Sequence, residues 1–255
     1  EEAASEATGP PSRSAEAPTR SQPAPQADGR KGSGPGAAAP AAAASRPSRN
    51  GYDPRLCVYR DRGSRLAEEY RSLRTNLLAR CPDRRFCYVV TSAMGGEGKT
   101  LTCLNLGFVM AEGRDTRTVI VDCDFRRPRV AKLLRMEPDP GMAQVLRGEA
   151  ALAEAVRPTA VESLFVIPAG RARANELGEL VNRPELAEVV ADLRSQYDCV
   201  LIDTPPVNSV SETGVIGGVV GEALVVVRMN KTHHESVEKA IGLLHAANVE
   251  VAGMV

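Results

Sequence analysis

The sequence predicts an α/β protein: a three-layer fold around a parallel sheet, preceded by a disordered N-terminal tail. Strand-like and helix-like segments alternate from Phe86 onward, which is the order that builds parallel sheets. The strand-like segments are near-continuous apolar runs, as expected for strands that helices cover on both faces. A glycine-rich loop at 93–100, "AMGGEGKT", joins the first of these strands to a helix.

The first 50 residues are predicted to be a disordered tail or linker, and residues 51–255 to be one domain. Residues 1–50 contain no Val, Ile, Leu, Met, Cys or aromatic side chain and consist mostly of Ala, Pro, Gly and Ser. Such a composition buries too little apolar surface to offset the entropy of ordering. The chain begins at Glu1 rather than Met and stops at Val255 inside an apolar run, so we expect a piece of a longer protein.

The composition limits which partners and which cellular compartment are expected. The 32 Lys and Arg balance the 32 Asp and Glu, aromatic residues make up 4% of the chain and Trp is absent, so no nucleic-acid partner is expected. The six cysteines form no CxxC pair, so the sequence gives little indication of a metal site. We expect the cysteines to be reduced, as in a cytoplasmic protein. No apolar run reaches the roughly 18 residues needed to span a bilayer.

The periodicity of the apolar residues predicts the elements in order. A helix is predicted over 65–80, with Ser64 as its N-cap. Its apolar residues recur at helical spacing: Leu66, Tyr70, Leu73, Leu77 and Leu78. Strands are predicted over 86–92, 118–124, 163–170, 198–206, 222–230 and 249–255. Helices are predicted between them, over 100–113, 127–135, 184–197 and 234–248.

The loop "AMGGEGKT" matches a phosphate-binding loop with Ala in place of the first Gly, and its position between a strand and a helix is the required context. Glycines let backbone amides turn around a phosphate, and the following helix points its N-terminal amides at the same group. Lys99 adds a charge for the outer phosphates and Thr100 a hydroxyl for Mg²⁺. The fold class is therefore a three-layer, parallel-sheet P-loop NTPase. The residues predicted to bind the nucleotide are Gly95, Gly96, Glu97, Gly98, Lys99, Thr100 and Leu101.

Three aspartates stand at the ends of two other buried strands. Asp122 and Asp124 end the run "VIVDCD", and Asp203 ends "VLID". Ligands of open α/β sheets bind at the carboxyl ends of the strands, and Mg²⁺ takes few carboxylates beside water and phosphate oxygens. The sequence therefore predicts Mg²⁺ near these carboxylates, with one of them left to handle a proton. The alternative is that the aspartates only cap helices.

The sequence favours ATP over GTP as the nucleotide. A guanine-binding Asn-Lys-x-Asp sequence follows a strand, and "NKTH" at 230–233 stands at a similar place. His233 replaces the aspartate that would accept hydrogen bonds from guanine. ATP and Mg²⁺ are therefore the predicted cofactors.

With these segments the chain resembles the bacterial tyrosine kinases of capsular and exopolysaccharide biosynthesis, a family of P-loop ATPases with deviant Walker motifs. The loop, the segment with Asp122 and the segment with Asp203 look like the Walker A, A′ and B motifs. The stretches "EEYRSLRTNL", "FRRPR", "IDTPPV", "IPAG" and "NELGEL" are also typical of that family. The resemblance covers about residues 64–255.

The resemblance implies an ATP-dependent protein-tyrosine kinase. In such an enzyme Lys99 would act on the transferred phosphate, and Thr100, Asp122 and Asp203 would hold Mg²⁺. Asp122 would also be the candidate base that takes the proton from a tyrosine hydroxyl, and Asp124 would orient the metal or the base. Tyrosine has a pKa of about 10, so an adjacent carboxylate helps the phenol to attack at neutral pH.

The resemblance also implies partners and a location. Glu68, Arg71 and Arg74 match the E-x-x-R-x-x-R pattern with which such kinases meet neighbouring subunits, so a ring-like homo-oligomer is expected. The alternative is a solvated charged face. The family works with a membrane-spanning chain-length regulator, fused or separate, and acts on tyrosine-containing proteins. The expected location is the cytoplasm, at the inner face of the membrane through such a partner or a segment outside this sequence.

The chain departs from the family in two places. Family members usually end with a cluster of tyrosines that are autophosphorylated, and this chain ends at Val255 without one. Of its five tyrosines, Tyr52 and Tyr59 lie in a lead-in that is expected to be flexible, and they are the expected acceptors within the chain. Glu212 stands where the family commonly has Asp, in a loop expected to affect the metal geometry.

Three other functions fit parts of the sequence. A nucleotide-switched scaffold, which hydrolyses ATP slowly and regulates a polysaccharide machine without phosphorylating protein, is favoured by the missing tyrosine cluster. A partition-type ATPase would carry a second lysine just after the first residue of the loop, where this chain has Met94. A metabolic enzyme of the same fold would need a further catalytic constellation, and no Ser/His/Asp set appears.

Overall fold

The computed structural model describes residues 51–81, 85–113 and 116–255, and the tail predicted over residues 1–50 lies outside them. The strands are β1 (Phe86–Ser92), β2 (Thr118–Asp122), β3 (Arg157–Pro158), β4 (Leu164–Ile167), β5 (Cys199–Asp203), β6 (Glu222–Val226) and β7 (Glu250–Met254). The helices are α1 (Cys57–Arg60), α2 (Arg65–Arg80), α3 (Lys99–Met110), α4 (Val130–Leu133), α5 (Met142–Leu146), α6 (Leu152–Ala155), α7 (Leu177–Val181), α8 (Glu185–Gln196), α9 (Glu212–Val220) and α10 (His234–Ala246).

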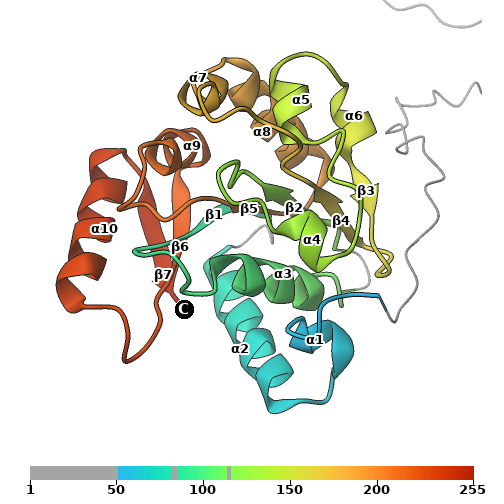
Figure 1. The fold of residues 1–255 in the computed structure, drawn as a ribbon. Helices are drawn as coiled ribbons and strands as arrows, with labels where there is room; N and C mark the ends of the chain where they lie inside the picture. The colour runs from blue at the N-terminus through green and yellow to red at the C-terminus, as the bar shows by residue number, and fades with distance from the viewer. Residues whose placement is uncertain (1–50, 82–84, 114–115) are drawn as a thin grey trace, which may run out of the picture. The chain divides into compact units, whose positions relative to one another are not determined.

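The strands form one seven-stranded sheet in the order β3-β4-β2-β5-β1-β6-β7 (Figure 1). All neighbouring strands run parallel except β3 and β4, which are antiparallel. The predicted α/β fold on a parallel sheet is confirmed, with the short edge strand β3 as the exception. The strands β2, β5 and β1, which precede the aspartates and the glycine-rich loop, are neighbours in the sheet.

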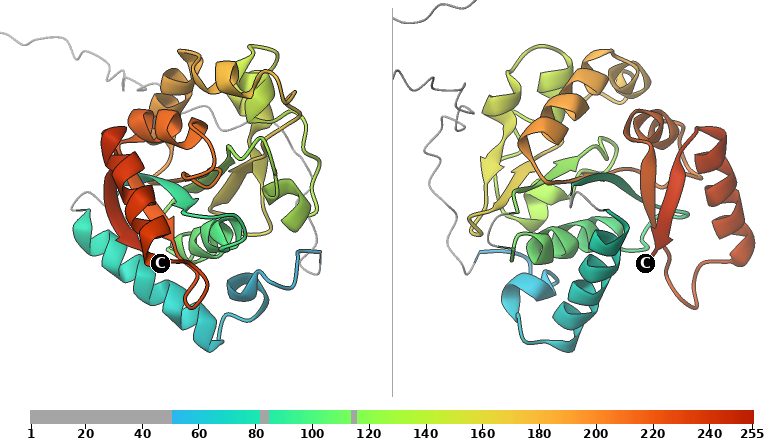
Figure 2. Two further views of the ribbon diagram at one scale, coloured as in Figure 1. Left: turned by 60° about the vertical axis from the view of Figure 1, so that its left-hand side comes forward. Right: turned by 180° about the vertical axis from the view of Figure 1, so that it is seen from behind.

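Helices cover the sheet on both faces, so the fold has three layers (Figures 1 and 2). Successive residues of β1 show the two faces: Tyr88 and Val90 belong to one buried apolar cluster, and Cys87 and Val89 to the other. The first cluster takes its helical residues from α1 to α4, and the second from α5 to α10. This alternation explains why the strands read as continuous apolar runs, because both sides of each strand are buried.

The elements predicted from periodicity are all present, with ends that differ by up to a few residues. The short elements α1, α5, α6, α7 and β3 were not predicted, because they are too brief to show a period. The nine-residue helix α9 also escaped prediction, because it contains three glycines, which are poor helix formers. Its packing explains the composition: a Cβ at Gly217 would lie 2.7 Å from Cγ2 of Val249, so the helix comes close to its neighbour only with glycine there.

Helix α2 follows the prediction over its whole length. The Ser64 side chain caps it by accepting a hydrogen bond from the Ala67 amide at 3.2 Å. One residue of the predicted apolar face is not buried: Leu66 is 59% exposed, whereas Ala67 and Leu77 are buried. The physical reason is that α2 packs outside α3 rather than on the sheet, so only a narrow stripe of the helix is covered (Figure 1).

Candidate functional site

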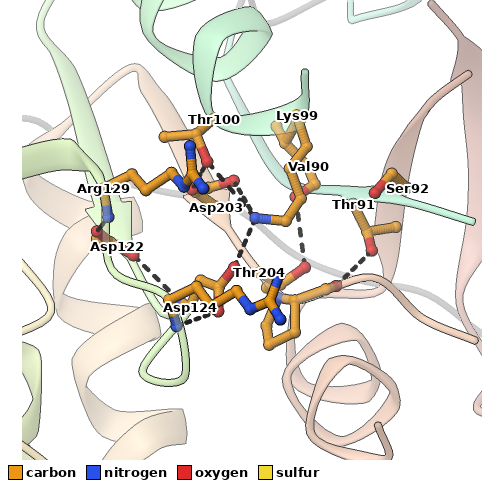
Figure 3. Close-up of polar contacts among 12 residues, drawn as sticks. Val90, Thr91, Ser92, Lys99, Thr100, Asp122, Asp124, Arg129, Asp203 and Thr204 are labelled. Atoms are coloured by element: carbon orange, nitrogen blue, oxygen red, sulfur yellow. Dashed lines mark hydrogen bonds and ion pairs between the residues drawn. The ribbon is translucent and has the colours of Figure 1, made fainter. Parts of the chain in front are cut away.

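Three loops converge at the carboxyl ends of β1, β5 and β2 (Figure 3). The strand register brings them together, since Val90 of β1 pairs with Asp203 of β5, and Asp203 pairs with Asp122 of β2. The glycine-rich loop, the two aspartates after β2 and the aspartate of β5 therefore share one edge of the sheet, as expected for a ligand site in an open α/β sheet.

The glycine-rich loop has the backbone that an anion site requires. Gly96 and Gly98 have φ values of 86° and 102°, in the left-handed region that glycine adopts without cost. Gly98 is the N-cap of α3, and the loop therefore leads directly into the helix. Among the described residues, no hydrogen-bond partner is found for the backbone amides of Gly98, Lys99 and Thr100. Open amides at a helix N-terminus are what a phosphate group needs.

A buried charge cluster lies against this loop (Figure 3). Lys99 Nζ is 2.6 Å from Asp124 Oδ2 and 3.6 Å from Asp203 Oδ1. The Thr100 hydroxyl donates to Asp203 Oδ2 at 2.7 Å. Burial lowers the pKa of Lys99, but the charges of Asp203 and Asp124 outweigh it and raise that pKa overall. The lysine is therefore a cation held in place by two carboxylates.

Asp122 is turned away from the open side of the site. Its Oδ1 accepts from the Asp124 amide at 3.1 Å, and its Oδ2 accepts from the amides of Arg129 and Val130 at 3.1 and 3.0 Å. Burial and the charge of Asp203 raise the pKa of Asp122 to about 8, in spite of these amides. Asp122 thus holds the turn that leads into α4, which agrees in part with the capping alternative.

Asp203 and Thr100 supply oxygens that suit a magnesium ion. Asp203 Oδ1 is buried and accepts no hydrogen bond among the described residues, and Lys99 lies at ion-pair distance from it. Burial raises the pKa of Asp203 to about 6, while Lys99 and the Thr100 hydroxyl act against that rise. In the described part of the chain, no three His, Cys, Asp or Glu side chains form a complete metal site. Mg²⁺ takes most of its ligands from phosphate and water, so the two oxygens of Asp203 and Thr100 are a fitting protein contribution.

The Glu97 side chain braces the loop. Its Oε2 accepts from the Met94 amide at 2.6 Å, and its Oε1 accepts from the Thr232 hydroxyl and from the Arg228 amide at 3.5 Å. The side chain thereby ties the loop to residues 228–232, which follow β6. Any contact of Glu97 with a nucleotide would come from its backbone. Sequence reasoning missed this tether because the partners are far apart in the chain.

A cavity of about 470 Å³ opens onto the loop and onto Asp124. That volume lies in the range of ligand sites. Its lining from the loop and α3 comprises Gly95, Gly96, Gly98, Lys99, Thr100 and Leu101. The rest of the lining comprises Arg55, Asp124, Arg126, Arg127, Arg129, Leu133, Pro205, Pro206, Ser209 and Val210. Asp124 is therefore the one of the three aspartates that borders the cavity.

Glu212 has a different neighbour from the one expected. Its side chain is buried at the start of α9, and its Oε1 accepts from Arg126 Nε at 3.1 Å. The loop with Glu212 was expected to affect the metal geometry. In the structure the Glu212 carboxylate pairs with Arg126 instead. Arg126 and Glu212 together join the segment after β2 to α9.

The predicted subunit-contact residues are engaged within the chain. Arg71 donates to Glu112 from Nε at 2.9 Å and from Nη2 at 2.8 Å, and it also pairs with Glu68. Arg74 Nη1 donates to the Val109 carbonyl at 2.6 Å. Both arginines thus bind the carboxyl end of α3, and Glu112 is a partner that the sequence pattern did not reveal. The ring interface remains a prediction.

The expectation that Tyr52 and Tyr59 lie in a flexible lead-in is wrong, because both side chains are packed. Tyr52 is 7% exposed, and its hydroxyl accepts from the Ala160 amide at 2.9 Å. The Tyr59 ring packs 4.8 Å from the Tyr52 ring and 5.2 Å from the Phe108 ring of α3. Burial raises the pKa of Tyr52. The lead-in is ordered because these rings cover the outer side of α3.

The other three tyrosines are also packed against the fold. Tyr88 and Tyr197 are buried, and Tyr70 is half-buried on α2. None of the tyrosines in the described part of the chain is an exposed residue. The same part of the chain holds no helix that is both long and apolar enough to cross a bilayer.

Comparisons with known proteins point to one family. An AAA-domain family model matches residues 87–240. The tyrosine-protein kinase wzc of Salmonella typhi is 31% identical over 189 residues, which cover 74% of this chain. The tyrosine-protein kinase YwqD of Bacillus subtilis is 28% identical over 215 residues, which cover 78% of this chain and 90% of the relative. The solved kinase domain of the Escherichia coli tyrosine kinase ETK superposes with a TM-score of 0.74 at 26% identity, covering 78% of each chain.

The chain covers different shares of the length of its relatives. The chain spans only 26% of the length of the Salmonella typhi protein, but most of the Bacillus subtilis protein.

Proposed function

The chain belongs to the AAA-domain family, within its group of bacterial tyrosine kinases, and from this premise we propose that it transfers the γ-phosphoryl group of ATP to a tyrosine hydroxyl. One observation carries the proposal: a single cavity is bordered by the phosphate loop, by Lys99 and Thr100, and by the carboxylate of Asp124. Phosphoryl transfer needs little more from a protein than positioning and charge neutralisation, and these groups supply both.

The loop residues Gly95 to Thr100 would receive the phosphates of ATP. The open amides at the start of α3 suit the inner phosphates, and Lys99 would divide its charge between Asp124 and the γ-phosphate. Thr100 and Asp203 would hold Mg²⁺. Asp122 is the third ligand that the sequence predicts, but both of its carboxylate oxygens accept hydrogen bonds from backbone amides. When bound, that ion neutralises charge on the phosphate oxygens. The carboxylate of Asp203 is already hydrogen-bonded to Thr100, which orients both oxygens.

In the transfer, the tyrosine oxygen bonds to the γ-phosphorus, the bond from that phosphorus to the β–γ bridging oxygen breaks, and ADP leaves. The phenolic proton passes to a carboxylate of this site. The sequence favours Asp122 as that base. The contacts support Asp124 as the carboxylate that touches the acceptor, since Asp124 borders the cavity while backbone amides occupy Asp122. Asp122 would then be a positioning residue for the turn after β2.

The assembly and location of the protein are part of the same proposal. Glu68, Arg71 and Arg74 would contact a neighbouring subunit in a ring-like homo-oligomer. The protein would act in the cytoplasm on tyrosine-containing proteins, at the inner face of the membrane, with a membrane-spanning chain-length regulator as its activator. Capsule or exopolysaccharide synthesis or export is the process that it would regulate.

A nucleotide-switched scaffold is the second candidate. It is supported by the packing of the tyrosines, because the described residues present no exposed tyrosine to the chain's own site. Such a protein would hydrolyse ATP slowly and regulate the same machinery by assembling and dissociating.

The test is phosphoryl transfer from γ-labelled ATP with Mg²⁺, with a tyrosine peptide and with the chain extended by a C-terminal tyrosine tail. The Asp122→Asn and Asp124→Asn variants are measured beside the wild type, and Lys239→Gln, an exposed change on α10, is the control. We expect labelled tyrosine that both aspartate variants reduce, Asp124→Asn more strongly. Free phosphate without labelled protein, with a candidate membrane activator present, would contradict the kinase and leave the switch.

A further inference from the structure

The cavity at the phosphate loop is also lined by four arginines. Arg55 comes from the lead-in before α1, whereas Arg126, Arg127 and Arg129 come from the turn after β2. Among the described residues that line the cavity, Asp124 is the one acidic side chain, and Lys99 is already paired with it. The lining therefore carries an excess of positive charge, which favours an anionic ligand.

Two of these arginines have carboxylate partners and two do not. Arg55 Nε lies 2.9 Å from Asp53 Oδ1, and Arg126 pairs with Glu212. For the guanidinium groups of Arg127 and Arg129, no hydrogen bond or ion pair is found within the described part of the chain. Both residues are exposed, and their charges are available to a ligand.

The backbone of the two unpaired arginines is nevertheless held firmly. The Arg127 amide donates to Asp124 Oδ1 at 3.0 Å, and the Arg129 amide donates to Asp122 Oδ2 at 3.1 Å. Figure 3 shows Arg129 beside Asp122 and close to the Lys99 cluster. These bonds fix the backbone of both residues at the rim of the cavity, so each guanidinium group starts from a defined position there.

The phosphates of ATP have donors in this cavity without these arginines. The open amides of Gly98, Lys99 and Thr100 and the Lys99 ammonium face the phosphate position at the start of α3. The same cavity has an apolar side made by Leu101, Leu133, Pro205, Pro206 and Val210. An aromatic ring is the kind of group that buries well against such side chains. The cavity thus combines a surface for a ring with a surface for carboxylates.

We propose that Arg127 and Arg129 select the acceptor, so that the preferred substrate is a tyrosine flanked by Asp or Glu in an extended peptide segment. This inference rests on the proposed kinase function. Guanidinium groups bind carboxylates in a planar, two-pronged geometry, which gives direction as well as charge. Two arginine–carboxylate pairs of this exposed kind contribute a preference of roughly 2- to 30-fold.

The test compares two fluorescent peptides with the same central tyrosine, one flanked by Glu and the other by Gln. Their binding to the full chain is measured by fluorescence anisotropy with Mg²⁺ and a non-hydrolysable ATP analogue. We expect the Glu peptide to bind roughly 2- to 30-fold more tightly, and the ratio to shrink as salt is added. In the Arg127→Gln/Arg129→Gln variant the ratio should fall to about one. Any general loss of affinity cancels, because the ratio compares two peptides on one protein.

The matched control removes two exposed positive charges elsewhere. Arg65→Gln/Lys239→Gln changes the net charge by the same amount, and neither residue lines the cavity. We expect this control to keep the full ratio. An Arg127→Lys/Arg129→Lys variant, which keeps the charges but loses the planar groups, should retain part of it.

Three results would overturn the inference. They are equal binding of the two peptides by the wild type, an unchanged ratio in the double glutamine variant, and a loss of affinity for the ATP analogue with the peptide ratio preserved. The last result would assign the arginines to the nucleotide. Phosphotyrosine formation is measured in parallel reactions that contain ATP in place of the analogue. A binding preference without transfer would sink the kinase proposal and keep the acidic-peptide site, whereas transfer without a preference would do the reverse.

Discussion

The buried charge cluster at the phosphate loop predicts the effect of removing its lysine. Lys99 Nζ lies 2.6 Å from Asp124 Oδ2 and 3.6 Å from Asp203 Oδ1, and the three side chains are 11%, 5% and 0% exposed. Lys99→Met keeps an apolar stem but removes the charge, so two buried carboxylates lose their counter-ion. We expect the nucleotide-free protein to lose stability, independently of any loss of phosphate binding.

The size of that loss follows from the burial. Removing one partner of a buried ion pair costs about 3–5 kcal/mol. The lower end is expected here, because burial already raises the pKa of Asp203 to about 6 and this carboxylate can take up a proton. With a urea slope of about 2–3 kcal/mol per M for a domain of this size, a loss of about 3 kcal/mol lowers the urea midpoint by about 1–1.5 M.

The assay is urea unfolding of the full chain without nucleotide, followed by circular dichroism at about pH 5 and about pH 8. The loss should be smaller at the lower pH, where the carboxylates protonate. Adding Asp124→Asn to Lys99→Met should restore part of the stability, because one uncompensated charge is removed. Lys239→Met, an exposed change on α10, should have little effect. A midpoint that Lys99→Met leaves unchanged at both pH values would refute the reasoning.

Three further predictions concern packing, pH and the tyrosines. Gly217→Ala places a methyl group 2.7 Å from a buried valine carbon, whereas Gly214→Ala in the same helix meets only ordinary contacts. The free energy of unfolding measured in urea should therefore be lower for the first variant than for the second by about 1–3 kcal/mol. The pKa of Asp122 is raised to about 8 in the folded protein, so without Mg²⁺ the native state keeps a proton that the unfolded chain releases. Stability should therefore fall as pH rises from about 4 to about 8, by up to about 1.4 kcal/mol per pH unit, and less steeply in Asp122→Asn; equal slopes would contradict this. Phosphopeptide mapping after reaction of the native protein should find no phosphate on Tyr52 or Tyr59, because both rings are packed, and label on either would show that the lead-in opens.

Local signals predicted much of the fold correctly. The helix at 65–80 was predicted because its cap and its period lie within the helix itself, and the structure has it at Arg65–Arg80. The strands were predicted because burial on both faces leaves a continuous apolar run. Helix α9 was missed because its glycines are unfavourable in any isolated helix, and only their contacts with Ala247 and Val249 explain them.

The contacts of the charged residues depended on distant parts of the chain. Arg71 and Arg74 share a helix face with Glu68, as their spacing predicts, but both also bind residues at the end of α3. Glu97 looked like one more residue of the loop, yet its side chain is bound to residues 228–232. Side-chain spacing along one helix or loop contains no information about such partners.

The sequence by itself determined that the chain alternates strands and helices, that a phosphate loop follows the first strand, and that aspartates end two others. Each of these features is local, because a helix period, a glycine turn or a strand end needs only neighbouring residues. Only the tertiary structure decided that Asp124 and not Asp122 borders the cavity, and that Arg55 joins Arg127 and Arg129 there. The physical reason is that strand order and helix packing bring distant segments together, and the direction of each side chain follows from that packing.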